Sequence, residues 1–320
     1  MTDMHGKQRA GLKYPAGRIR HAGAHAALRL AALLVALLAT SGAAAEPQIL
    51  HSEKSLYRDI VVMQEDGLRC MRFGRYAAAR QTCVNVGAAQ RLVFDYTKMM
   101  MAALYFNPAP RRVLVLGLGG GTLPMTVARL FPEARIDAVE IDPAVVRVAR
   151  RFFNFRDSDR VKVFEEDARV YVKRARTRLA PAERYDLVML DAFDHEYIPE
   201  HLLTREYFQE LRGIMTGRAT LAANTFSASR LYDHESATYH AAFGDFYRLK
   251  KANRVILLRL GGLPDATELA RNADRVEALL KPLGTGKADL LGELAIERGW
   301  PADTRVLTDQ YSPSNLLNAR

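Results

Sequence analysis

Residues 112–121 read Arg-Val-Leu-Val-Leu-Gly-Leu-Gly-Gly-Gly, an apolar run typical of a buried strand that leads into a glycine-rich loop. Such a loop allows a sharp turn and a close approach of the backbone to a ligand, and residues 123–130 are predicted to form the helix whose N-terminus faces that ligand. A second apolar strand, over 136–139, ends at Glu140, where a carboxylate can accept hydrogen bonds from both hydroxyls of a ribose. The stretch therefore predicts a nucleoside-binding crevice in a doubly wound α/β sheet.

The glycine loop taken alone has a second interpretation, because any tight connection from a strand to a helix can use glycines. The order of strand, loop, helix, strand and acid favours the ligand site. Dinucleotide-binding loops usually have the spacing G-x-G-x-x-G, whereas Gly117, Gly119 and Gly121 are followed here by Thr122 and Leu123. The spacing therefore argues against NAD as the ligand.

The chain has 320 residues, 49% of them apolar and 26% charged, as expected for an α/β domain with an appendage. Residues 1–45 have a different composition. Basic residues precede an apolar run over 30–39, and small residues end the segment at Ala45. This order predicts a secretory signal peptide cleaved near Ala45, because the apolar run is short for a membrane span.

Two alternatives stay open for this leader: an uncleaved N-terminal membrane anchor, or a start codon assigned too far upstream of a cytosolic protein. A cleaved signal peptide and an uncleaved anchor would both place the folded domain outside the cytoplasm, in the periplasm or the extracellular space. The leader holds half of the formal net charge of +10. The remaining charge gives no reason to predict nucleic-acid binding, and we expect no stable membrane span in the mature form.

The two cysteines, Cys70 and Cys83, lie in strand-like runs over 68–73 and 81–86. If these runs pair as an antiparallel hairpin with a symmetric loop, the two sulfurs face each other and a disulfide is feasible. Two buried free thiols are the alternative. The pair has no histidine ligands nearby, so we predict no metal site.

The rest of the chain alternates between helical and strand-like patterns. A small antiparallel unit (59–63, 68–73 and 81–86) and a helix over 94–105 come first. Further helices are predicted at 143–152, 168–178, 205–212 and near 236–243, and further strands at 161–164, 185–190, 219–223 and 254–260. This alternation predicts a mainly parallel sheet covered on both faces.

Four parts of the chain follow from these patterns. They are the leader (1–45), a β-hairpin unit with its helix (46–106), a Rossmann-like nucleoside-binding domain (107–262), and a C-terminal helix over 263–280 with a closing strand near 306–309 (263–320).

Ligands of such sheets bind beyond the carboxyl ends of the strands, so the residues after each strand are the candidates for function. They are the loop 117–121, Glu140, Asp167 with Ala168, and Asp191 with Asp194. Asp167 is placed to accept a hydrogen bond from the exocyclic amine of an adenine, and so many acids suit a cationic ligand. A helix cap is the alternative role for Asp191 or Asp194.

These stretches resemble the spermidine synthase family of aminopropyltransferases, which share the fold of class I S-adenosylmethionine-dependent methyltransferases. The resemblance covers about residues 52–260 and includes Phe94-Asp95-Tyr96, the glycine loop, Val139-Glu140-Ile141-Asp142, Glu166-Asp167-Ala168 and Asp191-Ala192-Phe193-Asp194. It implies that the nucleoside is bound by Gly117, Gly119, Gly121, Glu140, Asp167 and Ala168. It further implies that Asp191 helps to deprotonate an attacking amine and that Asp194 and Tyr96 line the amine pocket.

The resemblance also implies decarboxylated S-adenosylmethionine as co-substrate, a small-molecule amine as acceptor, and a homodimer, which is common in the family. In aminopropyl transfer a neutral amine attacks the carbon beside a sulfonium, and methylthioadenosine leaves. An amine with a pKa of ~10 arrives protonated, so a carboxylate must bind it and assist the loss of its proton. Asp191 can bind one amino group of a polyamine, and Asp194 can bind another.

Three positions depart from the family pattern. Gly120 stands where the family has an acid that meets the aminopropyl ammonium, Lys98 places a cation near a pocket for a polycation, and Phe193 makes that pocket more apolar. Two other functions therefore stay open. One is a methyltransferase that uses S-adenosylmethionine, whose carboxylate would not be repelled at position 120. The other is a non-catalytic extracytoplasmic protein that binds nucleosides or polyamines.

Overall fold

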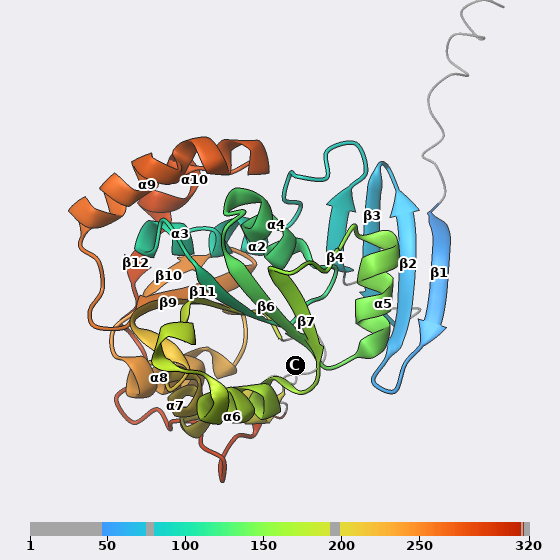
Figure 1. Cartoon of the computed structure of the whole chain (residues 1–320). Coiled ribbons are helices and arrows are strands. Elements are labelled where there is room, and N and C mark those ends of the chain that lie inside the picture. Colours follow the sequence, from blue (N-terminus) through green and yellow to red (C-terminus); the bar gives the residue numbers. More distant parts are fainter. Residues whose placement is uncertain (1–46, 75–79, 193–198, 315, 317–320) are drawn as a thin grey trace, which may run out of the picture. The chain divides into compact units, whose positions relative to one another are not determined.

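The computed structural model describes residues 47–74, 80–192, 199–314 and 316 (Figure 1). The predicted signal peptide lies outside these residues, and everything below refers to the unit that begins at Glu46. Its strands form two sheets. The smaller is antiparallel, in the order β1 (Gln48–Lys54), β2 (Asp59–Glu65), β3 (Leu68–Phe73) and β4 (Arg80–Asn85). The larger has the order β12 (Ala295–Ile296), β10 (Tyr247–Lys250), β11 (Asn253–Arg259), β9 (Met215–Phe226), β8 (Tyr185–Leu190), β5 (Arg112–Leu116), β6 (Arg135–Glu140) and β7 (Val161–Glu165).

The larger sheet is mainly parallel, as predicted. Strands β9, β8, β5, β6 and β7 run parallel, while β11, β10 and β12 are added antiparallel at one edge. The chain goes from β5 outward to β6 and β7, and then crosses to β8 on the other side of β5. The strand order therefore reverses between β5 and β8, which is where open α/β sheets bind their ligands.

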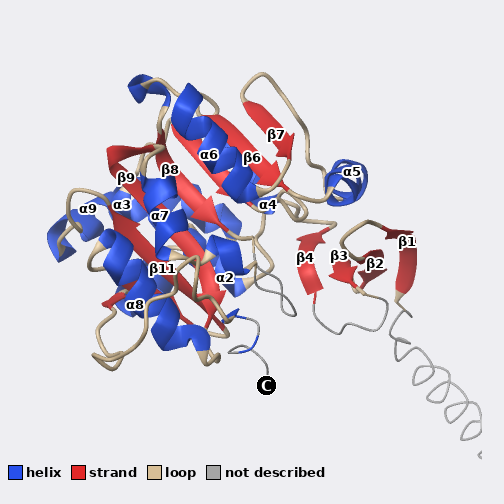
Figure 2. Ribbon diagram, turned by 90° about the horizontal axis from the view of Figure 1, so that it is seen from below, coloured by secondary structure: helices blue, strands red, loops and turns tan. Residues whose placement is uncertain are grey.

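Helices cover both faces of this sheet (Figures 1 and 2). One face packs against α2 (Asp95–Met100), α3 (Ala103–Phe106), α4 (Thr122–Leu130) and α9 (Ala266–Leu280), and the other against α6 (Ala168–Arg178), α7 (Arg205–Arg212) and α8 (Leu231–Phe243). Along β5, Val113 and Val115 face the first layer, and Leu114 and Leu116 face the second. Burial on both faces explains why this strand is apolar at every position after Arg112.

Helix α5 (Pro143–Phe152) joins the two sheets. Its residues Val145 and Val148 pack in one hydrophobic cluster with Ile60, Val62 and Met71 of the small sheet. Figure 2 shows the small sheet standing beside α5 and apart from the larger sheet. The packing brings β4 against the glycine loop, since the Thr82 side chain lies beside Gly120.

Three expectations about elements need correction. The helix expected over 94–105 is two short helices, α2 and α3, because the N–H groups of Met101 and Ala102 bond three residues back and tighten the turn between them. Strands β1, β10 and β12 were not predicted. The prediction of a closing strand near 306–309 is wrong: within this segment only Thr308 pairs, in an isolated bridge with Tyr311. The Leu307 N–H is held by the Thr238 hydroxyl (2.9 Å) rather than by a strand.

The expected hairpin pairing of the cysteines is confirmed. Cys70 and Cys83 are direct partners of β3 and β4 and form a disulfide, with sulfur atoms 2.01 Å apart. Both side chains are buried, in contact with Met63.

Removal of this disulfide is expected to destabilise the protein. A bridge across 13 residues restricts the unfolded chain, so the double variant Cys70→Ser/Cys83→Ser is expected to lose about 2–4 kcal/mol of unfolding free energy. Urea denaturation of the oxidised protein and the variant measures the difference. A reducing agent should lower the stability of the wild type alone, and equal midpoints for the oxidised wild type and the variant would contradict the expectation.

Candidate functional site

The glycine loop and Asp191 meet at the carboxyl ends of β5 and β8. The Asp191 N–H donates to the Leu116 carbonyl (2.8 Å), and the Gly117 N–H donates to the Val139 carbonyl (2.8 Å). Gly117 has φ of +95°, and a Cβ atom there would lie 2.1 Å from the Asp191 carbonyl oxygen. Only glycine fits this contact, so the loop and the residue after β8 are held together at the switch point.

Glu140 lies at the end of β6 and turns its carboxylate toward the glycine loop. One oxygen accepts the N–H groups of Leu118 (3.1 Å) and Gly119 (3.4 Å), and the other accepts that of Asp142 (3.1 Å). Burial raises the pKa of Glu140, whereas these backbone hydrogen bonds and the charge of Arg58 oppose the rise. The carboxylate thus fixes the loop at the same edge of the sheet where Asp191 lies.

Asp191 is partly buried between three other elements. The Asn224 amide group, near the end of β9, donates to its carboxylate (2.9 Å), and the Tyr96 hydroxyl of α2 also forms a hydrogen bond with it. Burial raises the pKa of Asp191 to about 6; the two hydrogen bonds oppose the rise and the charge of Glu140 adds to it. The predicted partners Asp191, Tyr96 and Glu140 are therefore brought together.

Asp167 caps the next helix at the same edge of the sheet. One of its oxygens accepts the N–H groups of Arg169 (2.8 Å) and Val170 (3.0 Å) at the start of α6, and the other lies 2.8 Å from Nε2 of His201. Burial acts to raise the pKa of Asp167, but the His201 hydrogen bond and the two backbone bonds outweigh it and lower the pKa. Ala168, the first residue of α6, is buried in the adjacent core.

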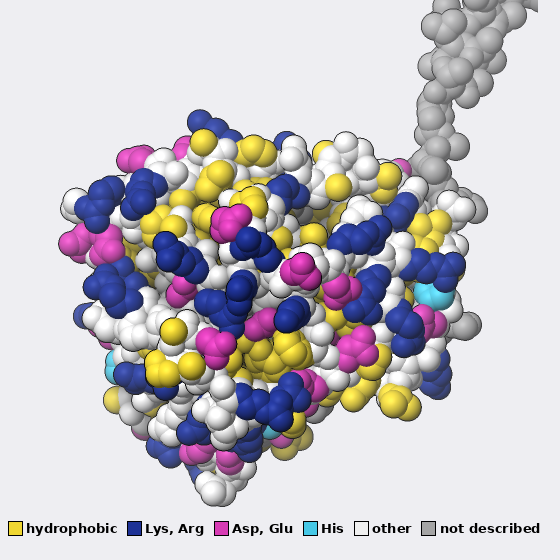
Figure 3. All heavy atoms as spheres, viewed as in Figure 1, with side chains coloured by type: hydrophobic (Ala, Val, Ile, Leu, Met, Phe, Trp, Pro, Cys, Tyr) yellow, Lys and Arg dark blue, Asp and Glu magenta, His cyan; other side chains and the backbone are white. Residues whose placement is uncertain are grey.

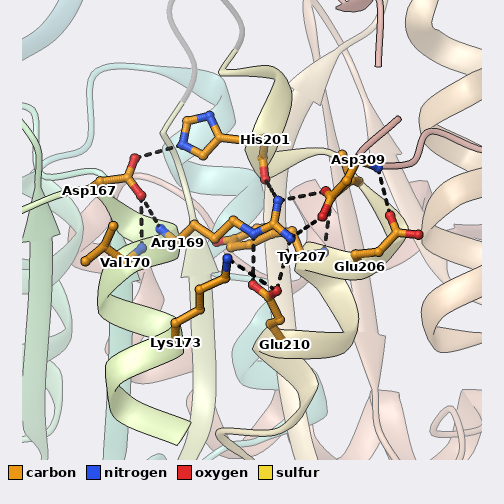
Figure 4. Close-up of polar contacts among 10 residues, drawn as sticks. Asp167, Arg169, Val170, Lys173, His201, Glu206, Tyr207, Glu210 and Asp309 are labelled. Carbon is orange, nitrogen blue, oxygen red and sulfur yellow. Dashed lines mark hydrogen bonds and ion pairs between the residues drawn. The ribbon is translucent and has the colours of Figure 1, made fainter. Parts of the chain in front are cut away.

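Arg169 anchors the C-terminal segment beside this acid (Figure 4). Its guanidinium makes paired contacts with Glu210 (2.9 and 3.0 Å) and with Asp309 (2.7 Å to each oxygen), and it also reaches the His201 carbonyl (3.3 Å). Asp309 in addition accepts the Thr204 hydroxyl (2.7 Å). Arg169 therefore ties α6, α7 and the segment containing His201 into one support for Asp167.

Two of the three departures from the family pattern lie within the described residues. The Lys98 ammonium is 3.4 Å from Asp95 in the same helix, so that cation has an acidic partner. A Cβ atom at Gly120 would lie 2.8 Å from both branches of the Thr82 side chain, so a larger residue at position 120 would displace Thr82. Asp194 and Phe193 lie outside the described residues.

Sequence reasoning missed Asn224 and Thr82. Asn224 directly follows the predicted strand over 219–223, so its place after the end of a strand is the signal that could have identified it. Thr82 gave no such signal, because it neighbours Cys83 in a strand of the small sheet and reaches the loop only through the packing on α5.

On the face drawn in Figure 3, Lys and Arg side chains are interspersed with Asp and Glu. A hollow of about 480 Å³ lined by Tyr247, Arg259 and Pro264, among others, contains none of the predicted site residues. In the part of the chain that the structure describes, we find no helix long and apolar enough to cross a bilayer and no cluster of three or more residues suited to hold a metal ion.

A glycine loop and partly buried acids at the switch point of a doubly wound sheet define the class of open α/β proteins that bind a ligand at this edge of the sheet. The sequence profile of the spermine/spermidine synthase domain matches residues 93–243. The polyamine aminopropyltransferase of Vibrio vulnificus is 44% identical over 294 residues, which are 89% of this chain and 97% of that protein. The chain belongs to the spermine/spermidine synthase family.

Two further comparisons are with a solved structure and with a sequence relative. A probable spermidine synthase from Corynebacterium glutamicum has a TM-score of 0.65 and 18% identity, covering 82% of this chain and 97% of that one. The mouse eEF1A lysine and N-terminal methyltransferase is 31% identical over 248 residues, which are 71% of this chain but 33% of that protein. The chain therefore matches about a third of the length of that methyltransferase.

Proposed function

We propose that this protein is an aminopropyltransferase that moves the aminopropyl group of decarboxylated S-adenosylmethionine to a small amine. The observation that carries the proposal is the carboxylate of Asp191, a residue at the switch point whose main chain contacts the glycine loop. Its pKa of about 6 leaves it ionised at neutral pH and makes it a stronger base than an ordinary aspartate, so it can bind an ammonium group and assist the loss of its proton. The 44% identity to an enzyme of this name supports the same reaction.

The nucleoside of the co-substrate is assigned to the side of the glycine loop on which Glu140 lies, at the carboxyl ends of β5 and β6. Among the described residues, a Cβ atom at Gly119 would meet only Thr82, at 4.0 Å, so none of these residues blocks the approach of a ligand to the backbone there. A carboxylate has about four acceptor positions, and Glu140 uses three for backbone N–H groups. One position is left for a ribose hydroxyl, and the long contact with Gly119 is the bond that a second hydroxyl would replace.

The adenine is assigned to the neighbouring Asp167 and to the backbone of Ala168. Asp167 binds His201 with one oxygen, and that oxygen keeps a further acceptor position for the exocyclic amine. Because the helix N-terminus and His201 both stabilise the ionised form of Asp167, it stays an acceptor at neutral pH.

In the proposed reaction, Asp191 acts first. Its carboxylate binds the ammonium of the acceptor and takes one proton, and the freed nitrogen lone pair attacks the carbon next to the sulfonium. A carbon–nitrogen bond forms, the carbon–sulfur bond breaks, and its electron pair stays on the sulfur of methylthioadenosine. Tyr96 donates a hydrogen bond to Asp191 and orients it. We assign Asp194 to the second ammonium of a polyamine.

A product assay tests this function. The purified domain is incubated with decarboxylated S-adenosylmethionine and, separately, with S-adenosylmethionine, each with a panel of diamines and monoamines, and products are identified by mass spectrometry. We expect methylthioadenosine and an aminopropylated amine in equal amounts. S-adenosylhomocysteine would instead indicate a methyltransferase, and the absence of both products would leave a binding protein.

Methyl transfer from S-adenosylmethionine is the second candidate, and one observation favours it. The place beside Gly120 is filled by the Thr82 side chain, which carries no charge and would not repel the carboxylate of S-adenosylmethionine. The likeness to the mouse methyltransferase is consistent with this alternative.

We further infer that residues 1–45 act as a signal peptide and that the mature domain is exported. The composition of the leader supports this, and so does the disulfide, because disulfides persist in oxidising compartments. A homodimer and the division of the chain at 106 and 262 stay predictions.

A further inference from the structure

A chain of two asparagine side chains leads from Asp191 into the antiparallel half of the sheet. The Asn224 amide donates from Nδ2 to Asp191 Oδ1 (2.9 Å), and its own Oδ1 accepts from Nδ2 of Asn253 (3.1 Å). Asn224 lies on β9 and Asn253 begins β11, and these strands are direct neighbours. Asn224 is 7% exposed.

An ionised carboxylate accepts hydrogen bonds and donates none, so Asn224 must turn its amino group toward Asp191. Its carbonyl oxygen then points the other way, in a place where water has little access. A buried carbonyl without a donor is costly, and Asn253 supplies that donor. When Asp191 is protonated, its O–H can donate to the Asn224 oxygen once the Asn224 amide turns over, and Asn253 then turns its own oxygen toward the Asn224 amino group.

We propose that Asn253 is a positioning residue that acts through Asn224 to hold Asp191 in its ionised, proton-accepting form. The inference rests on the proposed function, for which Asp191 is the base. Neither asparagine needs to touch the substrate. Removal of Asn253 leaves the Asn224 oxygen unpaired whenever Asp191 is charged, which shifts the balance toward the protonated acid.

Other groups around Asp191 also affect the equilibrium between its ionised and protonated forms. From α2, Tyr96 donates a hydrogen bond and favours the charged form, while from the end of β6 the carboxylate of Glu140 disfavours it. On the glycine loop, Gly117 contacts the Asp191 main chain and brings no titratable group. Among the described residues of β9 and β11, the pair Asn224 and Asn253 therefore stabilises the ionised form of Asp191.

A double-variant cycle tests the inference. Carboxyl-carbon NMR of the purified domain follows the titration of Asp191, identified by the signal that is lost in Asp191→Asn. We expect Asn253→Ala to raise the titration midpoint of Asp191 by about half to one pH unit, as for one lost hydrogen bond. Asn224→Leu should raise it at least as much, and the double variant should match Asn224→Leu alone, because Asn253 acts only through Asn224.

Activity gives the second measurement. In Asn253→Ala the acid limb of kcat/KM should move upward by the same amount, while activity above pH 8 stays close to that of the wild type. An unmoved midpoint in Asn253→Ala, or the same rise from Asn253→Ala in the Asn224→Leu background, would overturn the inference. The NMR titration requires no turnover, so a failure of the proposed function, seen as a missing product, is distinguishable from a failure of this inference.

Discussion

The variant Asp191→Asn is expected to lose about 10²–10⁴-fold in kcat/KM for aminopropyl transfer, the range typical of a missing general base. Asparagine keeps the size of the side chain and can still contact Asn224, but it cannot accept a proton. Steady-state kinetics at pH 8, with methylthioadenosine as the measured product, gives the loss.

Two controls separate chemistry from binding in this experiment. The variant should bind methylthioadenosine as the wild type does, because Asp191 is assigned to the amine and not to the nucleoside. Asp303→Asn, a substitution of an exposed aspartate outside the site, should leave the rate unchanged. In the wild type kcat/KM should fall as the pH drops below about 6, where Asp191 becomes protonated. Full activity of Asp191→Asn would show that Asp191 is not the general base.

The variant Glu140→Ala is expected to abolish the binding of methylthioadenosine, with an affinity loss of about 100-fold or more. The substitution removes the proposed ribose acceptor and also the oxygen that fixes the N–H groups of Leu118 and Gly119. Isothermal titration calorimetry measures the affinity.

A matched control for this variant is Glu165→Ala. Glu165 ends β7 and pairs directly with Glu140 in the sheet, but its carboxylate lies 3.7 Å from Arg150 on the surface. This variant should bind the nucleoside normally. Urea denaturation of both variants shows whether the sheet is intact, and an unchanged affinity in a folded Glu140→Ala protein would refute the assignment of the nucleoside to this place.

Much of the fold follows from the sequence where local signals are strong. The elements β3, β8, α5, α6 and α7 have the bounds that were predicted, because apolar periodicity and capping residues mark them. Asp142 and Asp167, for example, cap α5 and α6 with their side chains. The pairing of Cys70 with Cys83 followed from the symmetry of a hairpin.

The parts that were missed depend on tertiary contacts. Strand β1 is an edge strand with several exposed positions, and β10 has four residues, so neither has a clear apolar alternation. The bond between His201 and Asp167 joins residues 34 positions apart. The sequence likewise predicts that Glu140 accepts hydrogen bonds from both hydroxyls of a ribose, but it gives no sign that backbone N–H groups bind both oxygens of this carboxylate. Such contacts form only after the strands are side by side.

A crystal structure of the mature domain with 5′-methylthioadenosine tests the central claim most directly. The account predicts the ribose against Glu140 and the loop 117–121, the adenine beside Asp167, and the sulfur directed toward Asp191. A nucleoside bound elsewhere on the molecule, for instance in the hollow beside Tyr247 and Arg259, would contradict it.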